Sequence, residues 1–293
     1  MPRAVIAKCD RLDSLRVLLK GAWELRSADY WTVAKRLGIS VAQLRRDLKK
    51  LDAVGVVRYR YGYTEYVPTA ERMSLQAIDP RGEFGAALEV DWEGKVAVAS
   101  KLVELLPSSS VGTPQSMYVG AGTTMYTFAL TLARSRKHFH IYTRTLPTAL
   151  ASSQSPGLTV SVIGGTVDPR SLLTEGDGYD QVMHRPFDMG VFSCMAISPH
   201  GIFSDGVQDP VVQRRLIHNS RGVLIGVVGS KLAERSSGQL VTSYENLAGE
   251  VEWMRVVTTP PRSEEGERVL GSLQQKLRRL LPHVSDPLTV LWQ

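Results

Sequence analysis

Short apolar segments alternate with helical patterns from residue 116 onward, and this alternation constrains the fold more than any other feature of the sequence. The apolar segments include SMYVG, HFHIYT, LTVSVIGG, FDMGVFSCMAI and GVLIGVVGSK, and stretches such as AGTTMYTFALTLARS lie between them. Strands that alternate with helices form a parallel sheet covered by those helices. We therefore predict an α/β fold with a Rossmann-like, mostly parallel sheet, whose ligands bind at the carboxyl ends of the strands.

The predicted strands end in small, polar or basic residues. Glycine lets the backbone approach an anion, and hydroxyl groups and the free amides at a helix start donate hydrogen bonds to it. Such a rim suits a small phosphorylated metabolite, with Lys231 or Arg144 supplying positive charge. The candidate effector-binding residues from this pattern are Gly120, Ala121, Gly122, Thr123, Thr124, Thr143, Arg144, Thr145, Gly164, Gly165 and Lys231. A tight strand-to-helix turn is the alternative interpretation of the glycine-rich stretch at 120–124.

The basic excess lies in the first quarter of the chain. Residues 1–67 hold 14 Lys and Arg against 7 Asp and Glu, whereas residues 68–293 hold 21 against 22. This asymmetry indicates a module that binds a polyanion, joined to a nearly neutral body. A need for solubilising charge in a small domain is the alternative explanation.

The segment ISVAQLRRDLKKL, residues 39–51, predicts an amphipathic helix whose leucines face a core and whose other faces are basic. A second predicted helix begins after Ser27 and ends at Gly38, both typical boundary residues. Ser40 and Gln43 form a capping-box pattern at the start of the basic helix. The segment GVVRYRYGYTEYVP then predicts a two-stranded hairpin. Together these patterns indicate a winged helix-turn-helix.

The basic helix is the predicted recognition helix for the major groove of double-stranded operator DNA. Gln43 and Arg45 or Arg46 suit base edges, and the remaining cations suit phosphates. The candidate DNA-binding residues are Ser40, Gln43, Arg45, Arg46, Lys49, Lys50, Arg58 and Arg60. A solvated helix face is the alternative interpretation.

The run VAKRLGISVAQLRRDLKKLDAVGVVRYRYG resembles the N-terminal domain of the DeoR-type family of bacterial transcriptional repressors. The matching residues are Arg45, Arg46, Asp47, Leu48, Leu51, Gly55 and Arg58. Gln43-Leu44 and Tyr63 depart from the family's usual Thr-Ile pair and second wing glycine. Because of the Gln43-Leu44 departure, the resemblance does not predict the operator sequence.

Residues 93–259 resemble the family's sugar-phosphate-sensing domain, which is related in fold to ribose-phosphate isomerases. The resemblance rests on the helix around Lys95, the A-G-T-T turn, Thr143, Gly164-Gly165, Phe187-Asp188 and Ser230-Lys231. It adds Asp209, which stands where the family commonly has glutamate, to the candidate effector-binding residues. The resemblance implies a repressor whose operator binding responds to a small phosphorylated sugar or related anionic metabolite.

Three positions of the predicted rim depart from the family pattern. Gly120 and Val228 stand where aspartate is usual, and Arg144 stands where asparagine is usual. Two lost carboxylates and one gained guanidinium make the rim more positive, so we expect an effector that is more anionic than usual or is not a typical sugar phosphate. Loss of effector control is the alternative.

The expected domains are a winged helix-turn-helix at 1–67, a linker at 68–92, and an effector-sensing and oligomerisation domain at 93–293. RSEEGERVLGSLQQKLRRLLPHV predicts a C-terminal amphipathic helix, followed by a short strand in TVLWQ. Because symmetric operators are bound by paired half-site readers, we expect a homodimer or homotetramer.

Two other function classes remain as alternatives: a sugar-phosphate isomerase-like enzyme and an effector-independent DNA-binding protein. We expect no catalytic residues, metal or cofactor, because the sequence offers no credible nucleophile–base pair and no trusted metal-ligand spacing among its histidines. Only two cysteines occur, and neither a signal peptide nor an apolar run of membrane-spanning length is found. A cytoplasmic location away from membranes is expected.

Overall fold

The computed structural model describes residues 14–15, 18–19, 24–53, 57–60, 63–66, 83–107, 114–176, 178, 184–204, 209–236 and 238–291. The chain divides into two compact units, Met1–Ala77 and Ile78–Gln293. The described elements of the first unit are β1 (Glu24–Arg26), η1 (Ser27–Asp29), α2 (Tyr30–Arg36), α3 (Val41–Ala53), β2 (Val57–Arg60) and β3 (Tyr63–Tyr66).

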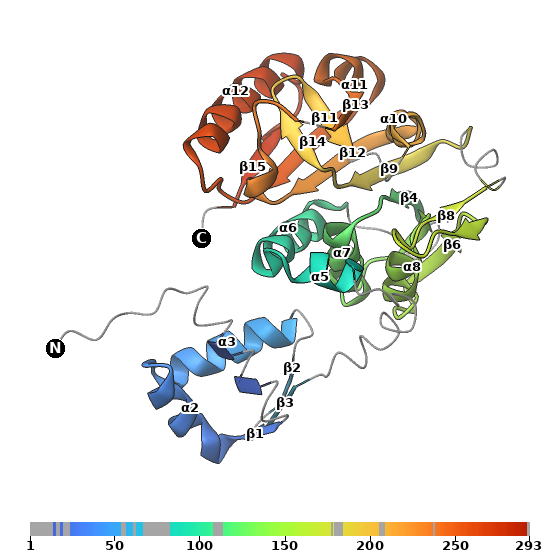
Figure 1. Ribbon diagram of the computed structural model, residues 1–293. Helices are drawn as coiled ribbons and strands as arrows, with labels where there is room; N and C mark the ends of the chain where they lie inside the picture. Colours follow the sequence, from blue (N-terminus) through green and yellow to red (C-terminus); the bar gives the residue numbers. More distant parts are fainter. Residues whose placement is uncertain are drawn as a thin grey trace. The chain divides into compact units, whose positions relative to one another are not determined.

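In the first unit, α2, α3 and the hairpin of β2 and β3 follow one another in the order expected of a helix-turn-helix with a wing (Figure 1). Gly38, at φ +65°, makes the turn between α2 and α3 in a conformation that favours glycine. Leu44, Leu48 and Leu51 are buried, as the apolar stripe predicted. The hairpin of β2 and β3 gains a third strand, β1, which pairs antiparallel with β3.

The second unit is built on a seven-stranded parallel sheet in the order β15-β14-β12-β9-β4-β5-β6. Its strands are β4 (Gln115–Val119), β5 (Phe139–Thr143), β6 (Leu158–Val162), β9 (Phe187–Phe192), β12 (Ser220–Val227), β14 (Trp253–Thr258) and β15 (Leu288–Val290). The chain runs outward from β4 to β6, returns to the other side of β4 at β9, and then runs outward again. The strand order therefore reverses between β4 and β9, which is where sheets of this type bind ligands.

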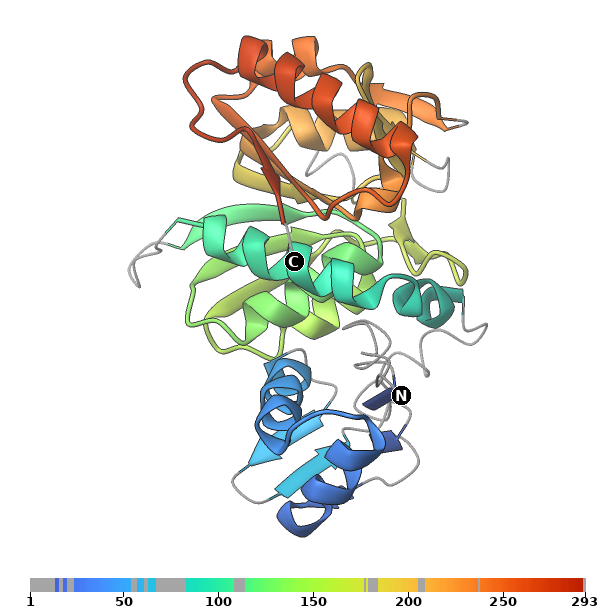
Figure 2. The same ribbon diagram turned by 90° about the vertical axis from the view of Figure 1, so that its left-hand side faces the viewer.

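Helices cover both faces of this sheet (Figure 1, Figure 2). They are α5 (Glu83–Glu89), α6 (Trp92–Leu105), α7 (Thr123–Ala133), α8 (Leu146–Ser152), α10 (Pro210–His218), α11 (Tyr244–Glu250) and α12 (Glu264–Leu280). One core cluster joins α6 and α7 to one face, and a second joins α10, α11 and α12 to the other. The predicted α/β fold is confirmed.

Smaller elements decorate the sheet. β10 (Ala196–Ser198), β11 (Gly201–Ser204) and β13 (Gln239–Thr242) form an antiparallel sheet, and β7 (Thr166–Val167) pairs with β8 (Thr174–Glu175). The 3-10 helix η3 (Gly229–Lys231) follows β12.

The stretch expected to be a linker, 68–92, is not irregular throughout. Helix α5 occupies its last part and α6 begins at Trp92, while residues 67–82 lie outside the described residues. Lys95 ties α5 to α6, because its ammonium donates hydrogen bonds to carbonyls in the last turn of α5. Among the described helices, none combines the length and apolarity needed to cross a membrane.

Candidate functional site

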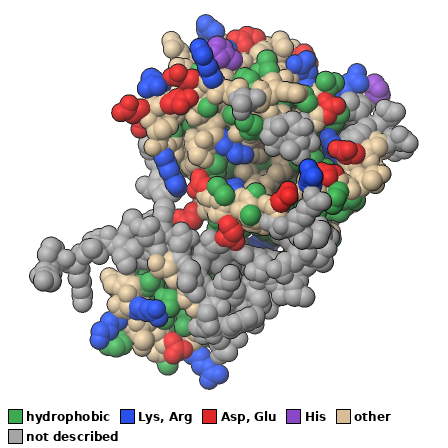
Figure 3. All heavy atoms as spheres, viewed as in Figure 1, with side chains coloured by type: hydrophobic (Ala, Val, Ile, Leu, Met, Phe, Trp, Pro, Cys, Tyr) green, Lys and Arg blue, Asp and Glu red, His purple; other side chains and the backbone are tan. Residues whose placement is uncertain are grey.

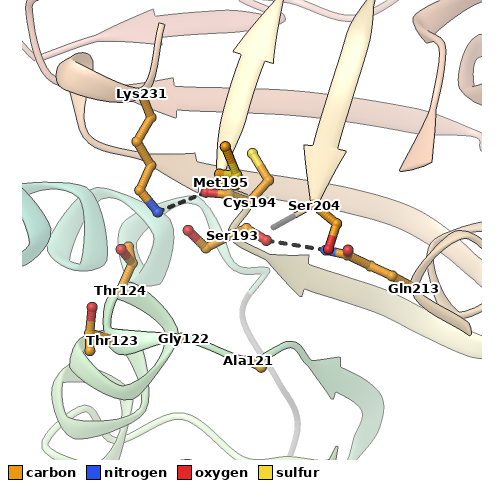
Figure 4. Close-up of a pocket in the computed structure, with 10 residues that line it drawn as sticks. All are labelled: Ala121, Gly122, Thr123, Thr124, Ser193, Cys194, Met195, Ser204, Gln213 and Lys231. Carbon is orange, nitrogen blue, oxygen red and sulfur yellow. Dashed lines mark hydrogen bonds between the residues drawn. The ribbon is translucent and has the colours of Figure 1, made fainter. Parts of the chain in front are cut away.

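A pocket of about 160 Å³ lies where the strand order reverses, at the carboxyl ends of β4 and β9 (Figure 4). It is lined by Ala121, Gly122, Thr123, Thr124, Ser193, Cys194, Met195, Ser204, Gln213 and Lys231. These ten residues include one cation and no carboxylate. The pocket therefore suits a small ligand that carries negative charge.

The start of α7 forms one wall of the pocket. Gly122 occupies the N-cap position at φ +100°, and no side chain caps the helix. The first helical hydrogen bond runs from Tyr126 N to Gly122 O, so the preceding amides have no partner within the helix. Exposed amides and the positive end of the helix dipole together favour an anion at this point.

Lys231 supplies the positive charge of the pocket. It ends the short helix η3, whose first residue, Gly229, lies so close to Pro260 O that a β-carbon would come within 2.3 Å of that oxygen. Only glycine fits at this position, so Gly229 is required where η3 begins. The Lys231 ammonium then donates a hydrogen bond of 2.7 Å to Cys194 O, at the opposite wall.

A second lysine, Lys95, lies within electrostatic range of Lys231. Lys95 is only 4% exposed, and its Nζ donates to Ala87 O at 2.5 Å and to Leu88 O at 3.4 Å. Burial, and to a lesser extent the charge of Lys231, lower the pKa of Lys95 to about 8, while Asp91 and Glu89 oppose the shift. The two ammonium groups repel each other, and an anion bound between or beside them would reduce this repulsion.

The segment between β9 and β10 forms the wall opposite α7. The sequence had placed Ser193 and Cys194 inside one long apolar strand, but the strand ends at Phe192 and the chain crosses the pocket before β10 begins. Both side chains are buried. Burial raises the pKa of the Cys194 thiol to about 12, so this thiol stays protonated and is a poor nucleophile.

Gln213 completes the pocket from α10, and the sequence analysis missed it. Asp209 caps this helix by accepting a hydrogen bond of 2.8 Å from Val211 N, and Pro210 occupies the first turn. The side chain of Gln213, one turn later, is buried and donates to Ser193 O at 3.4 Å. Asp209 and Pro210 could have predicted the start of α10 from the sequence. Which side of α10 faces the pocket is seen only in the folded structure.

Several predicted effector-binding residues lie outside this pocket. Gly120 N donates to Val191 O as part of the sheet. The Thr143 hydroxyl accepts from Thr145 N, and the Thr145 hydroxyl caps α8 by accepting from Thr148 N. Gly165 packs against the Glu175 backbone, where a β-carbon would come within 1.9 Å of Glu175 O. Local structure therefore accounts for these residues.

Arg144 is buried beside the β7–β8 hairpin. Its Nε and Nη2 atoms each lie 3.4 Å from Thr174 O. Burial lowers the pKa of the guanidinium, whereas Tyr118, Glu175 and Asp209 raise it. Neither Arg144, Asp209 nor the glycine pair Gly164-Gly165 is among the ten residues that line the pocket.

The predicted DNA-binding residues lie mostly on one helix. On α3, Arg45, Arg46, Lys49 and Lys50 are all exposed, and Lys and Arg side chains project from the described surface of the first unit in Figure 3. Ser40 Oγ accepts a hydrogen bond of 3.1 Å from Gln43 N and so caps α3. The backbone of Arg58 and Arg60 lies in β2, and their side chains are outside the described residues.

Gln43 is engaged within its own helix. Its amide nitrogen donates to Asp47 Oδ1 at 2.8 Å, and its amide oxygen accepts from Arg46 Nη2 at 2.6 Å. A base contact by Gln43 or Arg46 would have to replace these bonds. Within the described part of the chain, no group of three or more His, Cys, Asp and Glu side chains could hold a metal ion.

Comparisons with known proteins identify the family of the second unit. A family model described as the DeoR C-terminal sensor domain matches residues 91–245. No curated protein matches the sequence.

Among solved structures, ribose 5-phosphate isomerase A from Neisseria gonorrhoeae is 15% identical with a TM-score of 0.36, over 48% of this chain and 53% of that chain. The chain thus spans about half of that isomerase. The full-length sorbitol operon regulator SorC from Klebsiella pneumoniae is 12% identical with a TM-score of 0.36, over 88% of this chain and 97% of that chain.

Proposed function

This chain belongs to the DeoR family, whose sensor domain spans residues 91–245, and from this premise we propose that it is a transcriptional repressor controlled by a small phosphorylated metabolite. The first unit would bind double-stranded operator DNA, and the second would bind the effector. The protein would act as a homodimer or homotetramer, because two-fold operators pair two recognition helices.

The observation that carries the proposal is the composition of the pocket between β4 and β9. Uncapped amides at the start of α7 and the ammonium of Lys231 meet there, and none of the lining residues is acidic. A phosphate monoester satisfies both kinds of donor at once. Thr123 and Thr124 add hydroxyl groups beside the same amides.

The recognition helix supports the DNA-binding half of the proposal. Its leucines pack in the core of the first unit, and its four cations, Arg46 in a hydrogen bond to Gln43 among them, are exposed. The effector would change operator affinity by binding more tightly to one of two states of the protein. The difference between these two affinities sets the size of the response.

An isomerase is less well supported by the same pocket. Proton transfer between adjacent sugar carbons needs a tuned general base, most simply a carboxylate, close to the substrate. The lining residues offer none, and the Cys194 thiol is held protonated. A shared fold by itself does not assign catalysis.

A ligand screen with the full chain tests the proposal. Phosphorylated sugars and polyols, with the corresponding unphosphorylated compounds as controls, are added during thermal unfolding. A binding phosphate ester at a hundred times its Kd should stabilise the sensor by about 2.7 kcal/mol. Binding to operator fragments is then measured with and without that ester. A protein that binds no phosphate ester, or whose operator affinity does not respond to the one it binds, would contradict the proposal.

A further inference from the structure

The residues that line the pocket from the β9–β10 segment and from α10 include two with a buried polar atom that the folded protein leaves without a partner. These atoms, within the described residues, are Ser193 Oγ and Gln213 Oε1. Both side chains are 5% exposed. A buried polar group that lacks a hydrogen bond costs free energy, so it is usually retained where a ligand or ordered water completes it.

The neighbouring hydrogen bond fixes which end of the Gln213 amide is unpaired. Ser193 O is a carbonyl and can only accept, so the amide nitrogen of Gln213 must face it, as the 3.4 Å contact shows. The amide oxygen is consequently the end that points elsewhere. Figure 4 shows the Gln213 side chain reaching in from α10 toward Ser193.

An unpaired amide oxygen distinguishes between ligand groups because it can only accept hydrogen bonds. A phosphate dianion or a carboxylate has no proton to donate, so it would meet Gln213 Oε1 as a second acceptor. A ligand hydroxyl can donate to this oxygen. The Ser193 hydroxyl, which both donates and accepts, lies between this position and Lys231 in Figure 4 and is compatible with either group.

We propose that Gln213 is a specificity-determining residue, which selects an effector with a hydroxyl group at the end opposite its phosphate. The inference rests on the proposed function, because it assumes that the phosphate occupies the amides of α7 and Lys231. The pocket then takes a phosphorylated polyol or sugar. It discriminates against the same phosphate ester without hydroxyls and against one with a carboxylate at the far end.

Three four-carbon phosphates test this proposal with the full-length protein. Erythritol 4-phosphate carries hydroxyls, n-butyl phosphate carries none, and 4-phosphoerythronate carries a terminal carboxylate. Calorimetry of the wild-type protein should show erythritol 4-phosphate binding about tenfold more tightly than either analogue, the size expected for one well-placed hydrogen bond in a buried site. Inorganic phosphate serves as the probe of the anion position alone.

Substitution of Gln213 should remove the preference and leave the anion position intact. Gln213→Met keeps the length of the side chain, and should bind all three esters within about twofold of one another because the acceptor is gone. Gln275→Met, on the exposed side of α12, is the matched control and should keep the wild-type preference. Ser193→Ala provides a second variant, in which the preference for erythritol 4-phosphate over n-butyl phosphate should shrink.

The outcomes separate this inference from the function it rests on. Equal binding of the three esters by the wild-type protein overturns the role of Gln213 and leaves a phosphate-binding sensor. If Gln213→Met keeps the wild-type melting temperature and still prefers erythritol 4-phosphate, the proposed role of Gln213 is also overturned. Failure of all three esters and of inorganic phosphate to bind overturns the proposed function itself.

Discussion

Helices α3 and α7 both begin at a surface that we propose to bind phosphate groups, but their first turns are built differently. Ser40 Oγ caps α3 by accepting from Gln43 N, and the positive charge of that helix lies on exposed arginine and lysine side chains. Gly122 leaves the start of α7 uncapped, and only one cation lines the pocket beside it. We therefore expect α3 to bind mainly through its side chains, and α7 through its backbone amides.

This difference predicts how salt affects the two partners. Each phosphate of DNA that is neutralised releases counterions, so operator affinity falls steeply as the salt concentration rises. Effector binding in a pocket with one lining cation should depend less on the salt concentration, because fewer charges are involved. We therefore expect affinity to fall more steeply with salt concentration for operator DNA than for the effector.

The largest expected effect concerns the recognition helix. Replacing Arg45 and Arg46 together by alanine should lower operator affinity by about 100-fold, because each bidentate base contact contributes about 1–3 kcal/mol. Effector binding, followed by calorimetry, should be unchanged. Arg278→Ala/Arg279→Ala, an adjacent exposed pair on α12, is the control. If the Arg45/Arg46 variant lost both operator binding and effector binding, the two functions would not be separate.

Lys231→Met should have the next largest effect, this time on the effector. Loss of a charged hydrogen-bond donor should weaken phosphate-ester binding by about 30-fold, while operator affinity in the absence of effector stays at the wild-type level. Lys137→Met is matched to it, because the Lys137 ammonium also donates a 2.7 Å hydrogen bond to a backbone carbonyl, that of Leu106, outside the pocket. Equal effects of the two substitutions would show that Lys231 acts only through stability.

A smaller effect should appear in the pH dependence of effector binding. The lowered pKa of Lys95, about 8, means that its ammonium loses its proton near that pH in the free protein. An anion beside Lys231 favours the charged form, so binding takes up protons there, and affinity should fall severalfold between about pH 7 and about pH 9. The phosphate itself is already mostly the dianion at pH 7, because its second pKa is about 6.

The test of Lys95 is the loss of that pH dependence. In Lys95→Met the calorimetric affinity should vary less between the same two pH values. Lys101→Met, a partly exposed lysine of the same helix that pairs with Glu104, should behave as the wild type does. An affinity that rises with pH in the wild-type protein would contradict the sign of the coupling.

The smallest expected effect concerns the cap of α3. Ser40→Ala should lower the stability of the first unit by about 1 kcal/mol, because one amide of the first turn loses its partner. Chemical denaturation monitored through the tryptophans of each unit would report it. Gly122 offers no comparable side chain to remove, so this experiment addresses only the capped member of the pair.

The fold of both units could be predicted because its determinants are local. The leucine spacing of α3, the glycine of its turn and the alternation of strands and helices each depend on neighbouring residues in the sequence. The turn at Ala121–Thr124 and Lys231 follow directly from strand ends and were predicted for the same reason.

Gln213 and Ser193 could not be found in this way. Ser193 follows a strand that ends inside an apolar run, and Gln213 is an ordinary residue on an amphipathic helix. Their importance appears only when the sheet order brings β9 beside β4. Conversely, Arg144 and Gly165 lie at the ends of strands beyond the reversal point, where the β7–β8 hairpin packs against them. The expectation of an unusually anionic effector depended on Arg144, and it stays a prediction.

The hydrogen bond between Lys231 and Cys194 O has a consequence for the entropy of binding. A free lysine side chain gives up rotational freedom worth about 1.5–2 kcal/mol when it is immobilised. Here the hydrogen bond to Cys194 O already holds the four-carbon arm in place beside the pocket. An incoming ester therefore meets an ammonium whose ordering was completed during folding, and more of the contact energy remains available to shift the protein between its two states.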